Sequence, residues 1–500
     1  MKRYLKFLGP ILFLCGYSYL LTSYPIVVTD EPWYASTAYN FMHGLGLVNT
    51  SCGWRGGDEL FLYTVMLGGW FKIFGVSLLS GRAMSVVLGA VSLLGCWTFA
   101  REQRFSRVMT VGLMTLFSVS NLVFVVARRI RPEIVVLVCL VWGIVWMGRA
   151  LYRKGSLKFG PLLMALTLFL LSGFAHPLGF FVAFSAGVSA FFLPSLTFSD
   201  RFKMLTSSIV LACGIVLVYG FLWDFLKDGS LWAFVHTSLF ESQRLSVSGG
   251  FFDTFLVNCK TIFPSYVLGV KRLFIVIVEG VVLVLGLTLF RKSVVIRFLS
   301  GFTLVFLLST FFLMHYFYRV GFVFPHVILI FVMVLMVHQA YPLISRKWQL
   351  GLIGVVICYG VNHLAGDAIM LWNYRHMPPY AQLESRLDAL VPDDAVVLTH
   401  LPFWFAMKSN QIYHNNTYYP STSFSDTYDP KLPGVLDYAV LTDAFSTGRS
   451  PTTGEMESLY GTSHSTYYAQ AMAIVRSRPT TLMDTVTIPG YGSIRVYRFD

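Results

Sequence analysis

Two adjacent carboxylates, Asp30 and Glu31, directly follow the first long apolar run of the chain. A carboxylate at the edge of a membrane is partly desolvated, which raises its basicity and suits it to act as a general base. The pair also precedes Pro32, a position typical of the first turn of a short helix, where acids cap amides and favour the helix dipole. Position alone leaves both interpretations open.

Three arginines and one acid are concentrated between residues 127 and 133. Guanidinium groups match the geometry of phosphate oxygens, so we predict that at least one of these arginines binds a phosphate-bearing substrate. The alternative is that they extend to the membrane interface without a ligand. The residues are Arg128, Arg129, Arg131 and Glu133.

Other polar residues at loop positions are weaker candidates for substrate binding. Each one alone is a common capping or interfacial residue, and only their convergence on one membrane face strengthens the prediction. They are Asp58, Glu59, His176, His315, Tyr318 and Arg319. Glu279 lies inside an apolar run, where a carboxylate is either functional or neutral and hydrogen-bonded between helices.

The composition of the chain places these residues in a membrane. Hydrophobic residues make up 55% of its 500 residues and charged residues only 13%, which a compact water-soluble fold cannot accommodate. The formal net charge of +13 would suggest nucleic acid in a soluble protein. In a membrane protein the same excess marks cytoplasmic loops, so we expect no nucleic-acid partner.

Apolar runs of spanning length predict about eleven transmembrane helices. Their approximate ranges are 7–28, 82–100, 108–127, 132–148, 160–175, 177–194, 205–223, 273–290, 298–315, 321–341 and 349–366. The stretch 60–74 is short and contains Gly68, Gly69 and Lys72, which favours a helix lying along the interface.

The distribution of basic residues predicts the orientation. With 60–74 left outside, 17 of the 29 Lys and Arg of residues 1–370 lie on the cytoplasmic side, whereas a span at 60–74 would remove this bias. The N-terminus is then inside, and 10 of the 13 acids of this part lie outside. This concentration of charge suits an enzyme that acts on an anionic lipid at the outer face of the cytoplasmic membrane.

The chain divides near residue 370. Residues 1–370 form the transmembrane domain, with a first external loop at 29–81 and a long one at 225–271, and residues 371–500 read as an external α/β domain. Within the latter we predict a helix at 381–390, strands at 395–399 and 438–442, and a hairpin at 485–497. A structural cap is the favoured interpretation of this domain, and contact with an acceptor is the alternative.

The order of these motifs resembles the GT-C class of integral-membrane glycosyltransferases. The similarity lies in the branch of the protein O-mannosyltransferases and the bacterial aminoarabinose transferase of lipid A. It covers about residues 20–340 and includes Asp30-Glu31, the segments 70–75 and 127–133, Arg82, His176-Pro-Leu-Gly, Tyr318-Arg319 and Pro325. Two positions depart from the pattern: Gly56–Glu59 replaces a Lys-Pro-Pro-like segment, and Glu133 stands where many relatives have Asp.

The resemblance implies a polytopic α-helical fold and an inverting transfer of a monosaccharide from a polyprenyl-phosphate carrier. The acceptor would be a lipid, a glycan or a protein. By similarity, Asp30 is the base or orients the acceptor, Glu31 is its neighbour, and Arg128, Arg131 and Arg319 are candidates for the carrier phosphate. No cofactor is required, although Asp30 and Glu31 could hold a divalent metal.

Two other functions remain open on the sequence. A transporter or flippase for a lipid-linked saccharide would also collect arginines, but it should show inverted repeats and midplane charges, and only Glu279 fits the latter. A ligase that transfers whole glycans differs from the leading hypothesis in the size of donor and acceptor.

Overall fold

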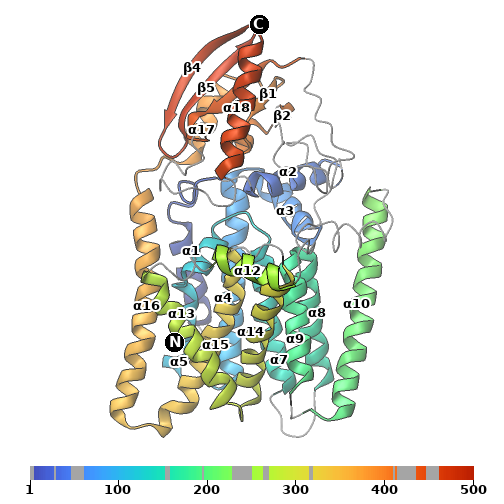
Figure 1. Ribbon diagram of the computed structural model, residues 1–500, viewed down its shortest axis with the longest axis vertical. Helices are drawn as coiled ribbons and strands as arrows, with labels where there is room; N and C mark the ends of the chain where they lie inside the picture. Colours follow the sequence, from blue (N-terminus) through green and yellow to red (C-terminus); the bar gives the residue numbers. More distant parts are fainter. Residues whose placement is uncertain are drawn as a thin grey trace.

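The computed structural model describes residues 5–27, 30–44, 46, 61–151, 158–193, 196–227, 251–262, 270–314, 319–408, 411–413, 435–445 and 461–500. Long helices form a bundle, and a small sheet lies at one end of it, beside the C-terminus (Figure 1). This is the architecture expected from the sequence, a polytopic helical part followed by a C-terminal α/β part.

Every predicted apolar span contains a helix. The helices of the bundle are α1 (Leu5–Ser18), α4 (Leu78–Glu102), α5 (Arg107–Ser118), α6 (Asn121–Ala127), α7 (Glu133–Leu151), α8 (Phe159–Ala175), α9 (Pro177–Phe191), α10 (Phe198–Lys227), α13 (Val270–Thr288), α14 (Val294–Leu313), α15 (Val323–Ala340) and α16 (Arg346–Tyr374). The short 3-10 helices η4 (Arg319–Phe322) and η5 (Tyr341–Leu343) flank α15.

Fewer helices than the predicted eleven meet the criteria of length and composition for a membrane span. Among the described residues, five helices are long and apolar enough to cross a membrane, and a sixth results if α5 and α6 count as one span. The prediction of about eleven spans is therefore not confirmed. Helices α8 and α9 are strongly apolar but have only 17 and 15 residues.

The predicted span 108–127 is broken. Helices α5 and α6 are bent by 59° relative to one another. Ser120 lies at the break, where it caps α6 by accepting a hydrogen bond from the amide of Val123 (3.3 Å). A hydroxyl next to Asn121 therefore interrupts the apolar run and starts a new helix in a new direction.

Helix α1 is also shorter than predicted, because it ends at Ser18 rather than near residue 28. Leu20 has a positive φ of 53°, which a helix does not accommodate. The chain then turns through residues 19–27 before α2 (Asp30–Met42) begins.

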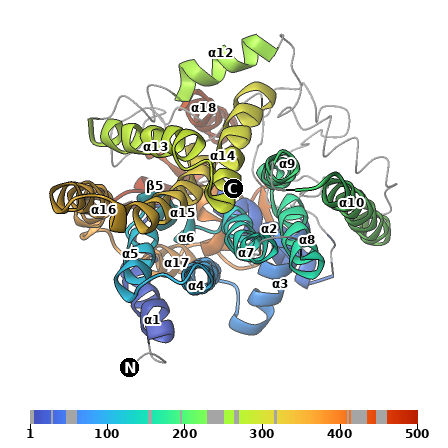
Figure 2. The ribbon, with the colours of Figure 1, turned by 90° about the horizontal axis from the view of Figure 1, so that it is seen from below.

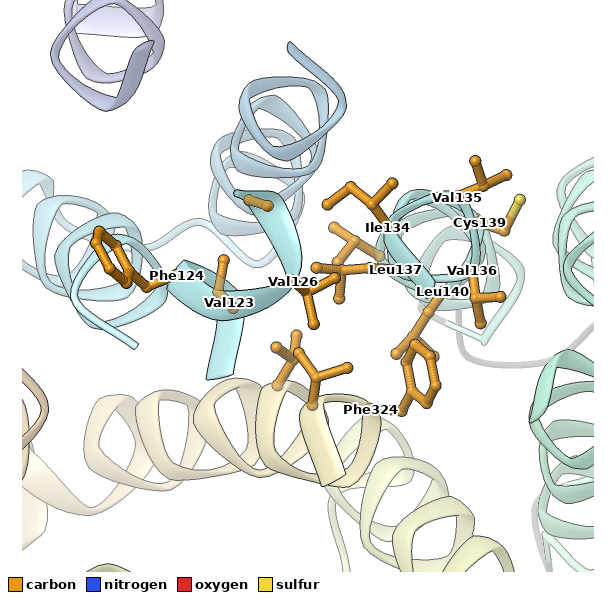
Figure 3. Close-up of a cluster of buried hydrophobic side chains, with 14 of the residues drawn as sticks. Val123, Phe124, Val126, Ile134, Val135, Val136, Leu137, Cys139, Leu140 and Phe324 are labelled. Atoms are coloured by element: carbon orange, nitrogen blue, oxygen red, sulfur yellow. The ribbon is translucent and has the colours of Figure 1, made fainter. Parts of the chain in front are cut away.

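Helix α15 lies at the centre of the bundle and is buried on all sides, with helices α5, α6, α7, α13 and α14 packed against it (Figure 2). A core of aliphatic and aromatic side chains joins α6 and α7 to α15, with Val126, Leu137 and Phe324 among its members (Figure 3). This core fixes the two helix ends between which residues 128–132 lie.

Among the described residues before the C-terminal part, three shorter helices lie outside the bundle. Helices α2 and α3 (Phe61–Phe74) pack together between the bundle and the sheet (Figure 1). The helix predicted at 60–74 is therefore present, while its position at a membrane interface stays a prediction. Helix α12 (Phe251–Ile262) packs against α14.

The C-terminal part is built on a mixed five-stranded sheet of order β2-β1-β3-β5-β4. Strands β1, β2 and β3 are parallel, and β5 is antiparallel to both β3 and β4. The elements are α17 (Tyr380–Asp388), β1 (Val396–Thr399), η6 (Leu401–Met407), β2 (Gln411–Tyr413), β3 (Tyr438–Thr442), η7 (Asp443–Phe445), α18 (Gly461–Ser477), β4 (Thr480–Ile488) and β5 (Gly492–Phe499). The predicted helix, strands and hairpin are all present.

Candidate active site

Asp30, Arg131 and Glu133 form an ion-paired cluster where the start of α2 meets the start of α7. The Nη1 atom of Arg131 lies 2.7 Å from Oδ2 of Asp30, and its Nη2 atom lies 2.7 Å from Oε1 of Glu133. The Nε atom donates to both oxygens of Glu133 at 3.1 Å. One guanidinium thus joins the acidic motif after α1 to the arginine-rich motif before α7.

Asp30 is the accessible carboxylate of this region. The exposed fraction of its side chain is 22%, against 2% for Glu133 and 0% for Glu31. A general base must come within hydrogen-bond reach of the proton that it removes, and of these three carboxylates Asp30 is the most accessible to another molecule. Arg131 holds one oxygen of Asp30 and so restricts the orientation of its carboxylate.

Glu31 makes a buried bidentate ion pair with Arg82 of α4. The Nε and Nη2 atoms of Arg82 lie 2.8 Å and 2.7 Å from the two carboxylate oxygens, and both side chains are fully buried. Glu31 also accepts a hydrogen bond from the amide of Ile130 (3.1 Å), and Arg82 donates to the carbonyl of Leu21 (2.7 Å). This pair therefore connects four segments beneath Asp30.

His176 reaches the same cluster from the turn between α8 and α9. Its Nδ1 atom accepts a hydrogen bond from the amide of Leu178 (3.1 Å), so the ring caps α9 and the proton of the neutral ring is on Nε2. The Nε2 atom lies 3.9 Å from Oε1 of Glu133. A Cβ atom at Gly179 would lie 2.0 Å from the carbonyl oxygen of Ser172, so this tight turn requires glycine.

Arg128 is directed away from this cluster. Its Nη1 atom donates to the carbonyl of Tyr17 (2.6 Å), and its Nη2 atom donates to those of Tyr19 (2.7 Å) and Tyr24 (3.0 Å). The guanidinium also lies 4.8 Å from the ring centre of Phe124. These contacts hold the turn after α1, and they favour a structural role over the predicted binding of phosphate.

Arg129 makes fewer contacts than its two neighbours. Its backbone carbonyl accepts a hydrogen bond from Ser85 (2.6 Å), and its buried Nε atom, like that of Arg128, has no hydrogen-bond partner. Unlike Arg128, it donates from its Nη atoms to no backbone carbonyl of the described residues. Within the described residues, no carboxylate forms an ion pair with this guanidinium. Of the three arginines, Arg129 is therefore the strongest remaining candidate for an anionic ligand.

Several predicted residues lie outside the described part of the chain. Asp58, Glu59, His315 and Tyr318 fall in undescribed segments, and of Arg319 only the backbone in η4 is described. Their proposed roles stay predictions.

The positions of the acids show which of them could bind a divalent metal ion together. Within the residues that the structure describes, no group of three or more His, Cys, Asp or Glu is placed to hold a metal ion. Asp30 and Glu133 face Arg131, and Glu31 faces Arg82, so these carboxylates point at guanidinium groups rather than at a shared centre.

The bundle contains a second polar cluster, of which the sequence analysis names only Glu279. Oε1 of Glu279 lies 2.5 Å from Nδ1 of His326 and accepts a hydrogen bond from Tyr359 (2.8 Å), while Nε2 of His326 lies 2.7 Å from the hydroxyl of Ser120. Glu279 is therefore hydrogen-bonded between helices, one of the two predicted alternatives. A histidine within the apolar run 323–340 was the available signal for His326.

The chain resembles solved structures of known proteins in its fold. No protein-family model matches the chain, and no curated protein matches it. Among solved structures, ArnT from Cupriavidus metallidurans bound to undecaprenyl phosphate is similar over 98% of this chain and 97% of its own, with 11% identity and a TM-score of 0.61. The oligosaccharyltransferase of Archaeoglobus fulgidus in the apo form matches 89% of this chain and 70% of its own, with 12% identity and a TM-score of 0.53.

These neighbours are GT-C glycosyltransferases, and the fold of this chain matches theirs. The GT-C architecture expected from the sequence is therefore confirmed at the level of the fold. The similarity to ArnT extends through the C-terminal domain, because nearly all of both chains is covered.

Proposed function

We propose that this protein transfers a monosaccharide from a polyprenyl-phosphate carrier to a hydroxyl of a lipid, glycan or protein at the outer face of the cytoplasmic membrane. The observation that carries the proposal is Asp30, an accessible carboxylate oriented by Arg131 at the end of a GT-C bundle. The neighbouring structures lend support by their ligands: ArnT was solved with undecaprenyl phosphate, and AglB of A. fulgidus with a dolichol-phosphate.

In the proposed reaction Asp30 accepts the proton of the acceptor hydroxyl while the hydroxyl oxygen attacks C1 of the sugar. The attack comes from the face opposite the phosphate. The bond between C1 and the phosphate oxygen breaks, and its electron pair stays on that oxygen. The products are a glycoside of inverted configuration and the free polyprenyl phosphate.

Charge develops on the departing phosphate, so cationic groups there would lower the barrier. We assign this role to Arg129, whose side chain makes no hydrogen bond or ion pair with the described residues, and to Arg319 on the basis of the sequence motif. Arg131 is assigned to orienting Asp30, because its Nη1 atom contacts Asp30 and its Nη2 atom contacts Glu133. Glu31 and Arg82 support the segment that carries Asp30.

The function is tested by assaying the purified protein in nanodiscs with short-chain polyprenyl-phosphate sugars and with lipid, glycan and peptide acceptors. We expect release of polyprenyl phosphate that depends on an acceptor, with a product of inverted anomeric configuration by NMR. Failure of the protein to bind any polyprenyl-phosphate sugar would exclude the proposal.

A ligase that transfers whole glycans is the nearest rival, because an oligosaccharyltransferase is among the structural neighbours. Offering lipid-linked oligosaccharides beside lipid-linked monosaccharides separates the two, since a ligase would use only the former. A transporter or flippase would move the lipid-linked sugar across a vesicle membrane without forming a glycoside.

The proposed site requires the sheet to lie on the outer side of the cytoplasmic membrane. We expect a membrane-impermeant maleimide to label Ser477→Cys, at the end of α18, in intact cells whose other cysteines have been replaced. Ser345→Cys, at the opposite end of the bundle before α16, should be labelled only after permeabilisation. The reverse pattern would contradict the orientation that the distribution of basic residues predicts.

A further inference from the structure

The turn between β4 and β5 contacts the segment that leads to Asp30. The hydroxyl of Tyr491 in this turn accepts a hydrogen bond from the backbone amide of Val27 (3.1 Å). Gly490 has a φ of +85°, and a Cβ atom there would lie 2.9 Å from Met377 and 3.1 Å from Ile26. The tip of the hairpin is therefore shaped to approach residues 26 and 27 closely.

Contacts within the C-terminal domain hold Tyr491 in place. Its ring packs against Tyr380 (ring centres 6.0 Å apart) and Phe403 (6.1 Å), and its backbone carbonyl accepts a hydrogen bond from Thr442. The Tyr491 residue is only 8% exposed. A side chain fixed in this way offers its hydroxyl oxygen at a defined position.

The C-terminal domain contacts the same region at two further points. The amide of Tyr380 donates to the carbonyl of Thr22 (3.3 Å), in the turn that follows α1. Trp404 of η6 packs edge-on against Tyr39, near the end of α2 (5.9 Å between ring centres). The domain thus holds the chain on both sides of Asp30, which is the first residue of α2.

The hydroxyl of Tyr491 is neutral in this position. Burial raises the pKa of this hydroxyl, and the hydrogen bond from Val27 and the charge of Arg82 lower it by smaller amounts, while Glu31 raises it.

We infer that Tyr491 is a positioning residue for Asp30, and that the C-terminal domain takes part in the reaction by fixing the segment from which the base projects. The inference rests on the proposed function. It assigns no contact with substrate to Tyr491, which acts through Val27 and the start of α2.

The test is the variant Tyr491→Phe, which removes one hydroxyl and keeps the ring. The matched control is Tyr497→Phe, on strand β5 that follows this turn, where the ring packs against a separate cluster of buried apolar side chains from the sheet and α18. Both variants are compared with the wild type by hydrogen exchange at the amide of Val27 and by steady-state kinetics normalised to the number of donor-binding sites.

We expect the amide of Val27 to exchange at least about tenfold faster in Tyr491→Phe. The kcat should fall by about tenfold or more, because a small displacement of a base is costly, while the KM of the donor stays within about twofold. Tyr497→Phe should match the wild type in all three measurements. A purely structural role would lower the amount of folded enzyme without this separation of kcat from KM.

Unchanged exchange at Val27, or faster exchange with unchanged kcat, would overturn the inference and leave the proposed function intact. A wild-type protein that transfers no sugar from any donor would overturn the proposed function itself, and the positioning role with it. The two failures are therefore distinguishable.

Discussion

Asp30→Asn is expected to lower kcat by about 10²–10⁴, the contribution typical of a positioned general base. The amide has nearly the shape of the carboxylate but cannot accept the proton of the acceptor. The variant should bind donor as tightly as the wild type, since the donor phosphate is assigned to other residues. Both quantities are measured in nanodiscs, by product formation and by equilibrium binding of a polyprenyl-phosphate sugar.

Asp388→Asn is the matched control for this experiment. Asp388 ends α17 in the C-terminal domain and is exposed, so the same change of chemistry occurs away from the site. Its kinetics should equal those of the wild type. Turnover of Asp30→Asn at the wild-type rate would show that another group accepts the proton.

Arg82→Met is expected to destabilise the protein by about 3–5 kcal/mol, the cost typical of leaving one member of a buried ion pair without its partner. Glu31 would keep only the amide of Ile130 as a hydrogen-bond partner among the contacts described above, and the carbonyl of Leu21 would lose its donor. The measurement is thermal or denaturant-induced unfolding in detergent, together with the yield of folded protein.

The chain offers a matched control in the ion pair of Arg149 and Glu102. The distance is similar, 2.9 Å against 2.7 Å, but the two side chains are 26% and 41% exposed. Arg149→Met should therefore cost no more than about 1 kcal/mol. Equal losses of stability in the two variants would contradict the structural role that we assign to the buried pair.

The helices of the bundle and four of the five described strands, all but β2, could be predicted because their signals are local. An apolar run of fixed length predicts a helix in lipid, and alternation between turn residues predicts a hairpin. The limits of α1 and the break after Ser118 could not be placed, because both depend on polar groups that find partners only in the folded chain. The carbonyls of Tyr17 and Tyr19, for example, bind Arg128 from a distant segment.

The residues of the candidate site could be named from the sequence, but their pairings could not. Asp30, Arg131 and Glu133 were recognised as candidates, and the structure brings them together. The sequence could not show that one guanidinium joins the two acids, nor that Glu31 is buried against Arg82 while Asp30 remains accessible. Which member of an adjacent pair faces the substrate is decided by tertiary packing, and residue type carries no information about it.

Helix α16 is attached to the bundle through polar side chains. The three buried residues of this 29-residue helix are Tyr359, His363 and Asp367, spaced four apart on one face. They are polar, and they bond to Glu279 and to Asn121 on neighbouring helices. Hydrogen bonds are directional where apolar contacts are not, so they select a single rotation of α16 about its own axis. Helix α16 leads directly into the C-terminal domain (Figure 1). The rotation of α16 about its axis therefore also sets the orientation of the sheet relative to the bundle.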